Sequence, residues 1–75
     1  MELKFRSKLV KMIRSIKTMF PKAKRHPGEK TIQKLEHGGI LALKDLVKKT
    51  VPDLEALGIE KEYAQMIVAY MRKRL

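Results

Sequence analysis

The sequence predicts an all-α protein, organised as one compact bundle of four or five short helices. Apolar residues recur at helical spacing in two long segments, residues 2–20 and 60–74. Prolines and glycines divide the region between these segments into shorter helical stretches. The strict alternation of apolar and polar residues that is typical of half-buried strands does not occur in the sequence. A chain of 75 residues is short enough to form a single domain, residues 1–75.

The first predicted helix covers residues 2–20 and carries one apolar stripe. Three- and four-residue steps dominate the stripe, which places its members on one side of a helix and leaves the basic residues around the rest of the circumference. The stripe consists of Phe5, Leu9, Met12, Ile13, Ile16 and Phe20. Pro21 ends this helix because proline disfavours the α conformation in the residue before it. Residues 21–28 (PKAKRHPG) then form a basic loop.

Two short helices are predicted in the middle of the chain. The first covers residues 29–37 and ends at Gly38-Gly39, where one glycine adopts the left-handed conformation. The second covers residues 41–49. The apolar face of this second helix consists of Leu43, Leu46 and Val47.

A fourth short helix is predicted over residues 53–57. Thr50 or Asp53 can cap its N-terminus, and Pro52 suits its first turn. Gly58 then ends the helix and allows the chain to reverse its direction.

The last predicted helix, residues 60–74, has the widest apolar stripe in the sequence. This stripe can pack against neighbours on two sides, so we expect the last helix to lie at the centre of the core. The stripe consists of Tyr63, Ala64, Ile67, Val68, Tyr70, Met71 and Leu75. Acidic residues at the start of this helix and basic residues at its end favour it through the helix dipole.

Two segments share one pattern, in which a short helix ends at glycine, isoleucine follows and another helix begins. They are residues 35–40 (LEHGGI) and 54–59 (LEALGI). The second segment continues into residues 57–67 (LGIEKEYAQMI), which resemble the hairpin of helix-hairpin-helix domains. This resemblance covers about residues 29–75 and implies a small helical DNA-binding fold. It also implies that backbone amides around Gly58 and Ile59 hold DNA phosphates without reading the base sequence.

The hairpin departs from that family at two positions. Glu60 stands where the second glycine of the family hairpin is found, and Leu57 stands where a proline is usual. The carboxylates of Glu60 and Glu62 repel phosphate. We therefore expect most phosphate contacts to come from basic side chains outside the hairpin.

The same stretch also resembles sterile alpha motif domains. The segment DLEALGI, residues 53–59, followed by a long last helix, is similar to the C-terminal half of that family. This second resemblance implies a protein-interaction module, in which the acidic residues near 53–62 pair with the basic face of another copy. Both resemblances imply a compact helical fold.

Positive charge is concentrated at the two ends of the chain. Residues 1–30 hold ten basic and two acidic side chains, residues 31–71 have a net charge of −1, and residues 72–74 are all basic. The total net charge is +10, and such an excess indicates a polyanionic partner. We expect the last helix to pack on the first, so that residues 4–30 and 72–74 share one face away from residues 53–62.

These features predict a non-sequence-specific nucleic-acid-binding module that contacts phosphates, with DNA favoured over RNA and double-stranded DNA over single strands. The candidate nucleic-acid contacts are Lys4, Arg6, Lys8, Lys11, Arg14, Lys17, Lys22, Lys24, Arg25, Lys30, Lys61, Arg72, Lys73 and Arg74. The alternatives are a sterile-alpha-motif-type interaction or self-association module and a membrane-surface binder that acts through the basic first helix. Membrane binding is disfavoured because the apolar stripe of that helix is needed for the core.

The composition argues against enzymatic and metal chemistry. The chain has no cysteine, and His26 and His37 lie on separate predicted elements. We find no catalytic constellation on one face, so we expect neither catalytic residues nor a cofactor or metal. The lack of cysteine and of a signal-peptide core fits an intracellular protein, in the cytoplasm and nucleoid or in the nucleus.

Overall fold

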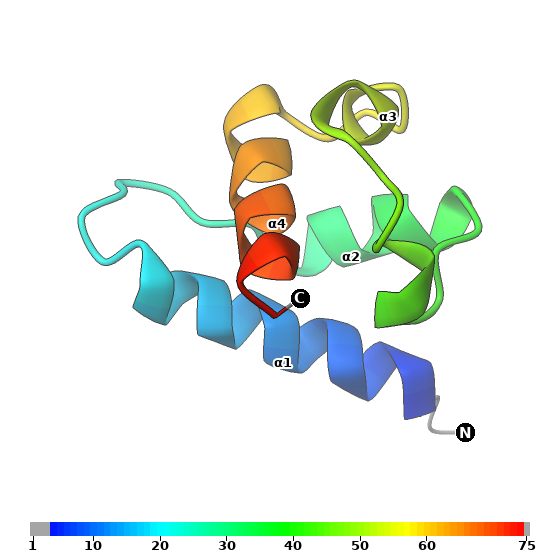
Figure 1. Cartoon of the computed structure of the whole chain (residues 1–75), viewed down its shortest axis with the longest axis horizontal. Helices are drawn as coiled ribbons and strands as arrows, with labels where there is room; N and C mark the ends of the chain where they lie inside the picture. The colour runs from blue at the N-terminus through cyan, green and yellow to red at the C-terminus, as the bar shows by residue number, and fades with distance from the viewer. Residues whose placement is uncertain (1–3, 75) are drawn as a thin grey trace.

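The computed structural model describes the backbone of residues 4–74 and the side chains of residues 8–73. Its elements are α1 (Lys4–Met19), α2 (Glu29–His37), the 3₁₀ helix η1 (Leu43–Asp45), α3 (Val51–Glu55) and α4 (Lys61–Arg74) (Figure 1). No strand occurs among the residues that are described, so the prediction of a small all-α bundle is confirmed.

The last helix, α4, lies at the centre of the molecule. It packs against α1 and α3, while α1 also contacts α2 and η1 (Figure 1). The side chains of Leu9, Met12 and Ile16 on α1, and of Ala64 and Ile67 on α4, are completely buried. Complete burial of one such leucine or isoleucine stabilises a fold by about 1.5–3 kcal/mol. The predicted packing of the last helix on the first is therefore confirmed.

The loop of residues 20–28 leaves α1 and returns to the bundle. The structure ends α1 at Met19, one residue before the predicted end, and the amide of Phe20 still donates to the carbonyl of Ile16 (2.9 Å). A ring nitrogen of His26, Nε2, lies 2.6 Å from the carbonyl oxygen of Phe20. Pro27 is fully buried, so the loop is anchored at both of its ends.

A Schellman motif ends α2 at the first glycine-isoleucine segment. The amide of Ile40 donates to the carbonyl of Leu35 (2.8 Å). The amide of Gly39 donates to the carbonyl of Glu36 (3.0 Å), and Gly39 has the left-handed φ of +85° that this motif requires. The predicted left-handed glycine is confirmed.

The turn after α3 has the same geometry. The amide of Ile59 donates to the carbonyl of Leu54 (3.3 Å), and the amide of Gly58 donates to that of Glu55 (2.9 Å). Gly58 has a φ of +92°. The isoleucine after each glycine, Ile40 or Ile59, is almost completely buried in the hydrophobic core.

The two turns also pack against each other. Lys34 of α2 donates a hydrogen bond from Nζ to the carbonyl oxygen of Gly58 (2.7 Å). A Cβ atom at Gly38 would lie 2.5 Å from a methyl carbon of Leu57, so Leu57 occupies the space that a side chain at position 38 would need. These contacts fix the end of α2 against the entrance to α4.

The prediction of an α-helix over residues 41–49 is wrong. Only η1 is helical there, and turns follow it. The carboxylate of Asp45 accepts hydrogen bonds from the amides of Leu41 and Ala42 (both 3.1 Å), which forms a tight turn. The chain then becomes extended at Thr50, with φ −110° and ψ 173°, so too few residues remain for a stable helix. Val47, which was expected to face inward, is 42% exposed.

The start of α3 is a capping box. The hydroxyl of Thr50 accepts a hydrogen bond from the amide of Asp53 (3.4 Å), and the carboxylate of Asp53 accepts one from the amide of Thr50 (3.0 Å). Thr50 is thus the N-cap, and Pro52 lies in the first turn as predicted. The α-helix covers Val51–Glu55 rather than residues 53–57, because helical conformation begins directly after the cap.

Replacing Gly58 should measure the cost of its left-handed conformation. A Cβ at this position has no heavy atom closer than 3.9 Å, so the cost of Gly58→Ala comes from the backbone. We expect the free energy of unfolding to fall by about 1–2 kcal/mol in urea titrations. Gly28→Ser is the control, because Gly28 is the N-cap of α2 with an ordinary φ of −142°. We expect this control to be neutral or stabilising, and an equal loss in both variants would contradict the interpretation.

Stability should also depend on pH through Asp53. Hydrogen bonds from the backbone amide and the hydroxyl of Thr50 lower the pKa of Asp53 below its usual value. The folded state therefore takes up this proton less readily than the unfolded state, so the stabilisation is complete above the unfolded pKa and is lost as the pH falls through the folded pKa. The measurement is the midpoint of thermal unfolding at pH 7 and at pH 3. We expect this midpoint to fall less on acidification in Asp53→Asn than in the wild type. Glu55→Gln, on the same helix, is the matched charge control.

Candidate nucleic-acid interface

The outer side of α1 is a continuous basic surface, which we call the α1 surface. The described side chains that form it are exposed: Lys8, Lys11, Arg14 and Lys17. They recur every three residues. Their side chains are therefore distributed over about 180° of the helix circumference and over about 13 Å along the helix axis. No acidic residue occurs between Glu2 and Glu29 in the sequence, so nothing on α1 neutralises these charges.

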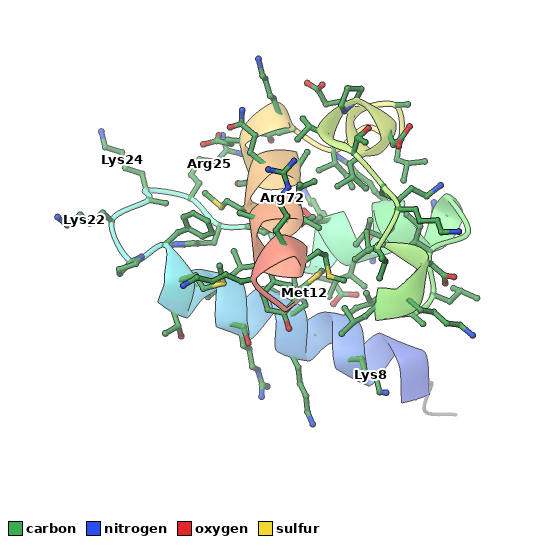
Figure 2. The ribbon with its side chains drawn as sticks, in the orientation of Figure 1. Lys8, Met12, Lys22, Lys24, Arg25 and Arg72 are labelled. Carbon is green, nitrogen blue, oxygen red and sulfur yellow. The ribbon has the colours of Figure 1, made fainter. Side chains whose placement is uncertain are left out.

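The remaining candidate residues of the N-terminal segment lie at the start of α1, in the loop after it and at the start of α2. Lys22 and Lys24 are exposed and point away from the bundle in the loop after α1 (Figure 2). Lys30 is exposed in the first turn of α2. Lys4 and Arg6 belong to the backbone of α1, but their side chains, like that of Arg74 at the end of α4, lie outside the described residues.

Arg25 contacts Glu60, which lies in the segment of residues 53–62 that carries four acidic side chains. Its Nη2 atom lies 2.9 Å from Oε2 of Glu60, and its guanidinium carbon lies 5.4 Å from the centre of the Tyr63 ring. Hydrogen bonding to Tyr63, followed by the charge of Glu60, raises the pKa of Arg25 above its usual value. Positive charge on Arg25 is therefore already partly neutralised, and the expectation that residues 4–30 lie away from residues 53–62 is wrong here.

The hairpin residues are occupied by structural contacts. The carbonyl of Gly58 accepts the hydrogen bond from Lys34, and Ile59 is 3% exposed. Glu60 directs a carboxylate oxygen to Arg25 beside the start of α4. Lys61, the first residue of α4, is exposed, so a single candidate cation remains at the hairpin among the described residues.

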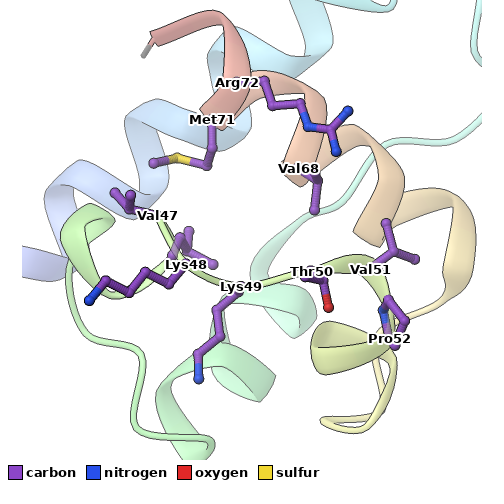
Figure 3. Close-up of a pocket in the computed structure, with 10 residues that line it drawn as sticks. Val47, Lys48, Lys49, Thr50, Val51, Pro52, Val68, Met71 and Arg72 are labelled. Carbon is purple, nitrogen blue, oxygen red and sulfur yellow. The ribbon is translucent and has the colours of Figure 1, made fainter.

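Arg72, near the end of α4, does not join the α1 surface. Tyr70 lines a hollow together with Lys8 and Lys11, which places Tyr70 on the side of α4 that faces α1. Arg72, two residues further on, points about 160° away from Tyr70 around the helix. Arg72 lines a groove between α4 and residues 46–52, and Arg72 and Lys73 both line its continuation along α4 (Figure 3). The predicted single face is therefore wrong for Arg72, which lies at the groove instead.

Two basic residues that sequence reasoning did not select lie at this groove. Lys48 and Lys49 are exposed and line it together with Arg72. They were overlooked because residues 31–71 were considered by their net charge, and the six acidic residues of that region cancel the charge of its lysines. The basic pair next to the predicted cap at Thr50 was the available signal.

Within the described part of the chain, no group of three or more histidine, cysteine, aspartate or glutamate residues is arranged to hold a metal ion. Among the same residues, no helix has both the length and the apolar character needed to cross a bilayer. In comparisons with known proteins, no family model, no curated protein and no solved structure matches this chain.

Proposed function

We propose that this protein binds double-stranded DNA without sequence specificity, through phosphate contacts made by the α1 surface and the loop that follows it. The observation that supports the proposal is the exposure of four basic side chains on one helix without an acidic neighbour on that helix. A polyanion lying along this surface replaces the repulsion between the cations with attraction and releases condensed counterions from the DNA.

The size of the α1 surface suits the groove of a duplex. The major groove of B-DNA is about 12 Å wide and admits an α-helix. Lys8 and Lys17 lie on opposite flanks of α1, so they can reach phosphates of the two strands, while Lys11 and Arg14 face outward between them. The chain contains no asparagine, and its two glutamines lie outside α1, so the side chains typical of adenine recognition are absent from this surface.

The proposed contacts are distributed differently from those of a helix-hairpin-helix domain. There, amides of the hairpin bind phosphate, whereas here Glu60 and Glu62 place negative charge beside the corresponding amides. We propose that Lys22, Lys24 and Lys30 add contacts at the edge of the α1 surface. Arg72 and Lys73 line a groove along α4 and are not part of this proposal.

Salt dependence tests the proposal directly. If six basic side chains contact phosphate, the logarithm of the binding constant should fall against the logarithm of salt concentration with a slope of about −5. In the double variant Lys11→Gln and Arg14→Gln, we expect the magnitude of the slope to fall by about 2 and binding at 0.1 M salt to weaken by about 60-fold. The measurement is fluorescence anisotropy with a short labelled duplex, at several salt concentrations.

Lys44→Gln is the control, because Lys44 is exposed in η1 and is not among the residues proposed to contact phosphate. We expect its slope to equal that of the wild type. No binding at low salt, or binding that does not respond to salt, would falsify the proposal.

A second experiment tests whether the Glu60 contact withholds Arg25 from DNA. Glu60→Gln and Glu62→Gln remove the same charge, but only the first residue contacts Arg25 in the described structure. We expect Glu60→Gln to increase the magnitude of the salt slope by about 1 and to tighten binding about eightfold at 0.1 M salt, because Arg25 becomes available to phosphate. Glu62→Gln should leave the slope unchanged. Equal effects of the two variants would show that general repulsion, rather than release of Arg25, controls affinity.

A further inference from the structure

A groove lies between α4 and residues 46–52, on the flank of α4 that does not face α1 (Figure 3). It has a volume of about 470 Å³, and a second hollow of about 460 Å³ adjoins it along α4. Both hollows are lined by Val51, Val68 and Arg72, so they form one continuous groove. Pockets that bind ligands usually have volumes of about 300–1,000 Å³.

The floor of the groove is aliphatic. Val68 points into it from α4, and Val51 faces it from the start of α3 (Figure 3). Val47 at its edge is 42% exposed and is one of two large apolar side chains that the described residues expose widely. Val47 lies in the turn that follows η1. The groove therefore offers apolar surface that the fold itself leaves uncovered.

The charged residues that line the groove are all basic. Lys48, Lys49 and Arg72 lie around the first hollow, and Lys73 lies at the second. All four side chains are exposed, and the residues that line the two hollows include no aspartate or glutamate. The partner that complements this rim carries negative charge on both sides of an apolar stripe.

Two features favour a protein segment over nucleic acid as the occupant. Base stacking on single strands needs aromatic rings, and the residues that line the groove include no aromatic residue. The phosphates of a duplex carry no apolar group that would fill the aliphatic floor. An acidic amphipathic helix matches both parts of the groove, because its apolar residues lie three or four positions apart and acidic residues flank them.

We propose that this groove binds an acidic amphipathic helix of another protein. Leucine or isoleucine side chains of the partner would pack on Val51 and Val68, and carboxylates beside them would pair with Lys48, Lys49 and Arg72. The groove is separate from the α1 surface, so the protein can join a partner to DNA, and each activity can be tested without the other.

The test uses a fluorescent peptide of about 14 residues, with leucines three and four positions apart and glutamates between them, at a length where isolated helices become marginally stable. We expect it to bind the full chain and to shift the NMR signals of residues 47–51, 68 and 72. Val47→Asp should weaken binding by about tenfold or more, because it places a carboxylate among those of the peptide and removes apolar contact. Leu41→Asp is the matched control, since Leu41 is 47% exposed but does not line the groove.

A second pair of variants tests the rim independently. We expect Lys48→Glu together with Lys49→Glu to weaken peptide binding, while Lys44→Glu, outside the groove, leaves it unchanged within about twofold. All of these side chains are exposed, so the variants should retain the wild-type circular dichroism spectrum.

Several outcomes would overturn the proposal. They are equal binding of a scrambled peptide of the same composition, wild-type affinity of Val47→Asp, and signal shifts centred on α1. If a DNA duplex shifts the groove residues and Val47→Asp weakens DNA binding instead, the groove belongs to nucleic acid. If sedimentation shows a dimer that Val47→Asp dissociates, the occupant is a second copy of this chain. Failure of DNA binding alone would leave the proposal intact.

Discussion

The contact between the two Schellman turns is the constraint on which the rest of the structure depends. Gly39 and Gly58 reverse the chain in the same way, and Lys34 and Leu57 connect the two turns by a hydrogen bond and by close packing at Gly38. Together they determine where α4 begins. Because α4 packs on both α1 and α3, its starting position sets the arrangement of the whole core. Short helices with few contacts of their own are thereby held in one geometry.

Much of this architecture could be predicted because glycine and proline act locally. The bounds of α2 and the left-handed Gly39 follow from residues that are neighbours in the sequence. Local residues also narrowed the cap of α3 to Thr50 or Asp53, and in the structure Thr50 is the cap, its hydroxyl paired with the carboxylate three residues later. The central position of α4 could also be predicted, since an apolar stripe too wide for one neighbour requires two.

Two kinds of feature could not be predicted in this way: a segment in which local contacts compete with the helical pattern, and contacts between distant residues. Residues 41–49 have a helical pattern, but Asp45 folds back on the preceding amides and Thr50 must be extended to cap α3. The pairing of Arg25 with Glu60 joins residues 35 positions apart, and counting charges by segment cannot show it. Lys48 and Lys49 join Arg72 only because the turn after η1 brings them beside α4. Local charge density indicated the α1 surface, whereas the groove depends on tertiary structure.

The use of both sides of α1 has a consequence for the unbound protein. The helix provides a large part of the core through Leu9, Met12 and Ile16. The basic residues on its other side therefore cannot move apart by unfolding the helix without disrupting that core. Like charges on that side oppose compaction, and dissolved ions weaken this opposition by screening it. Repulsion between these charges therefore lowers the stability of the fold in dilute solution, and the proposed anionic partner along α1 would stabilise the native state.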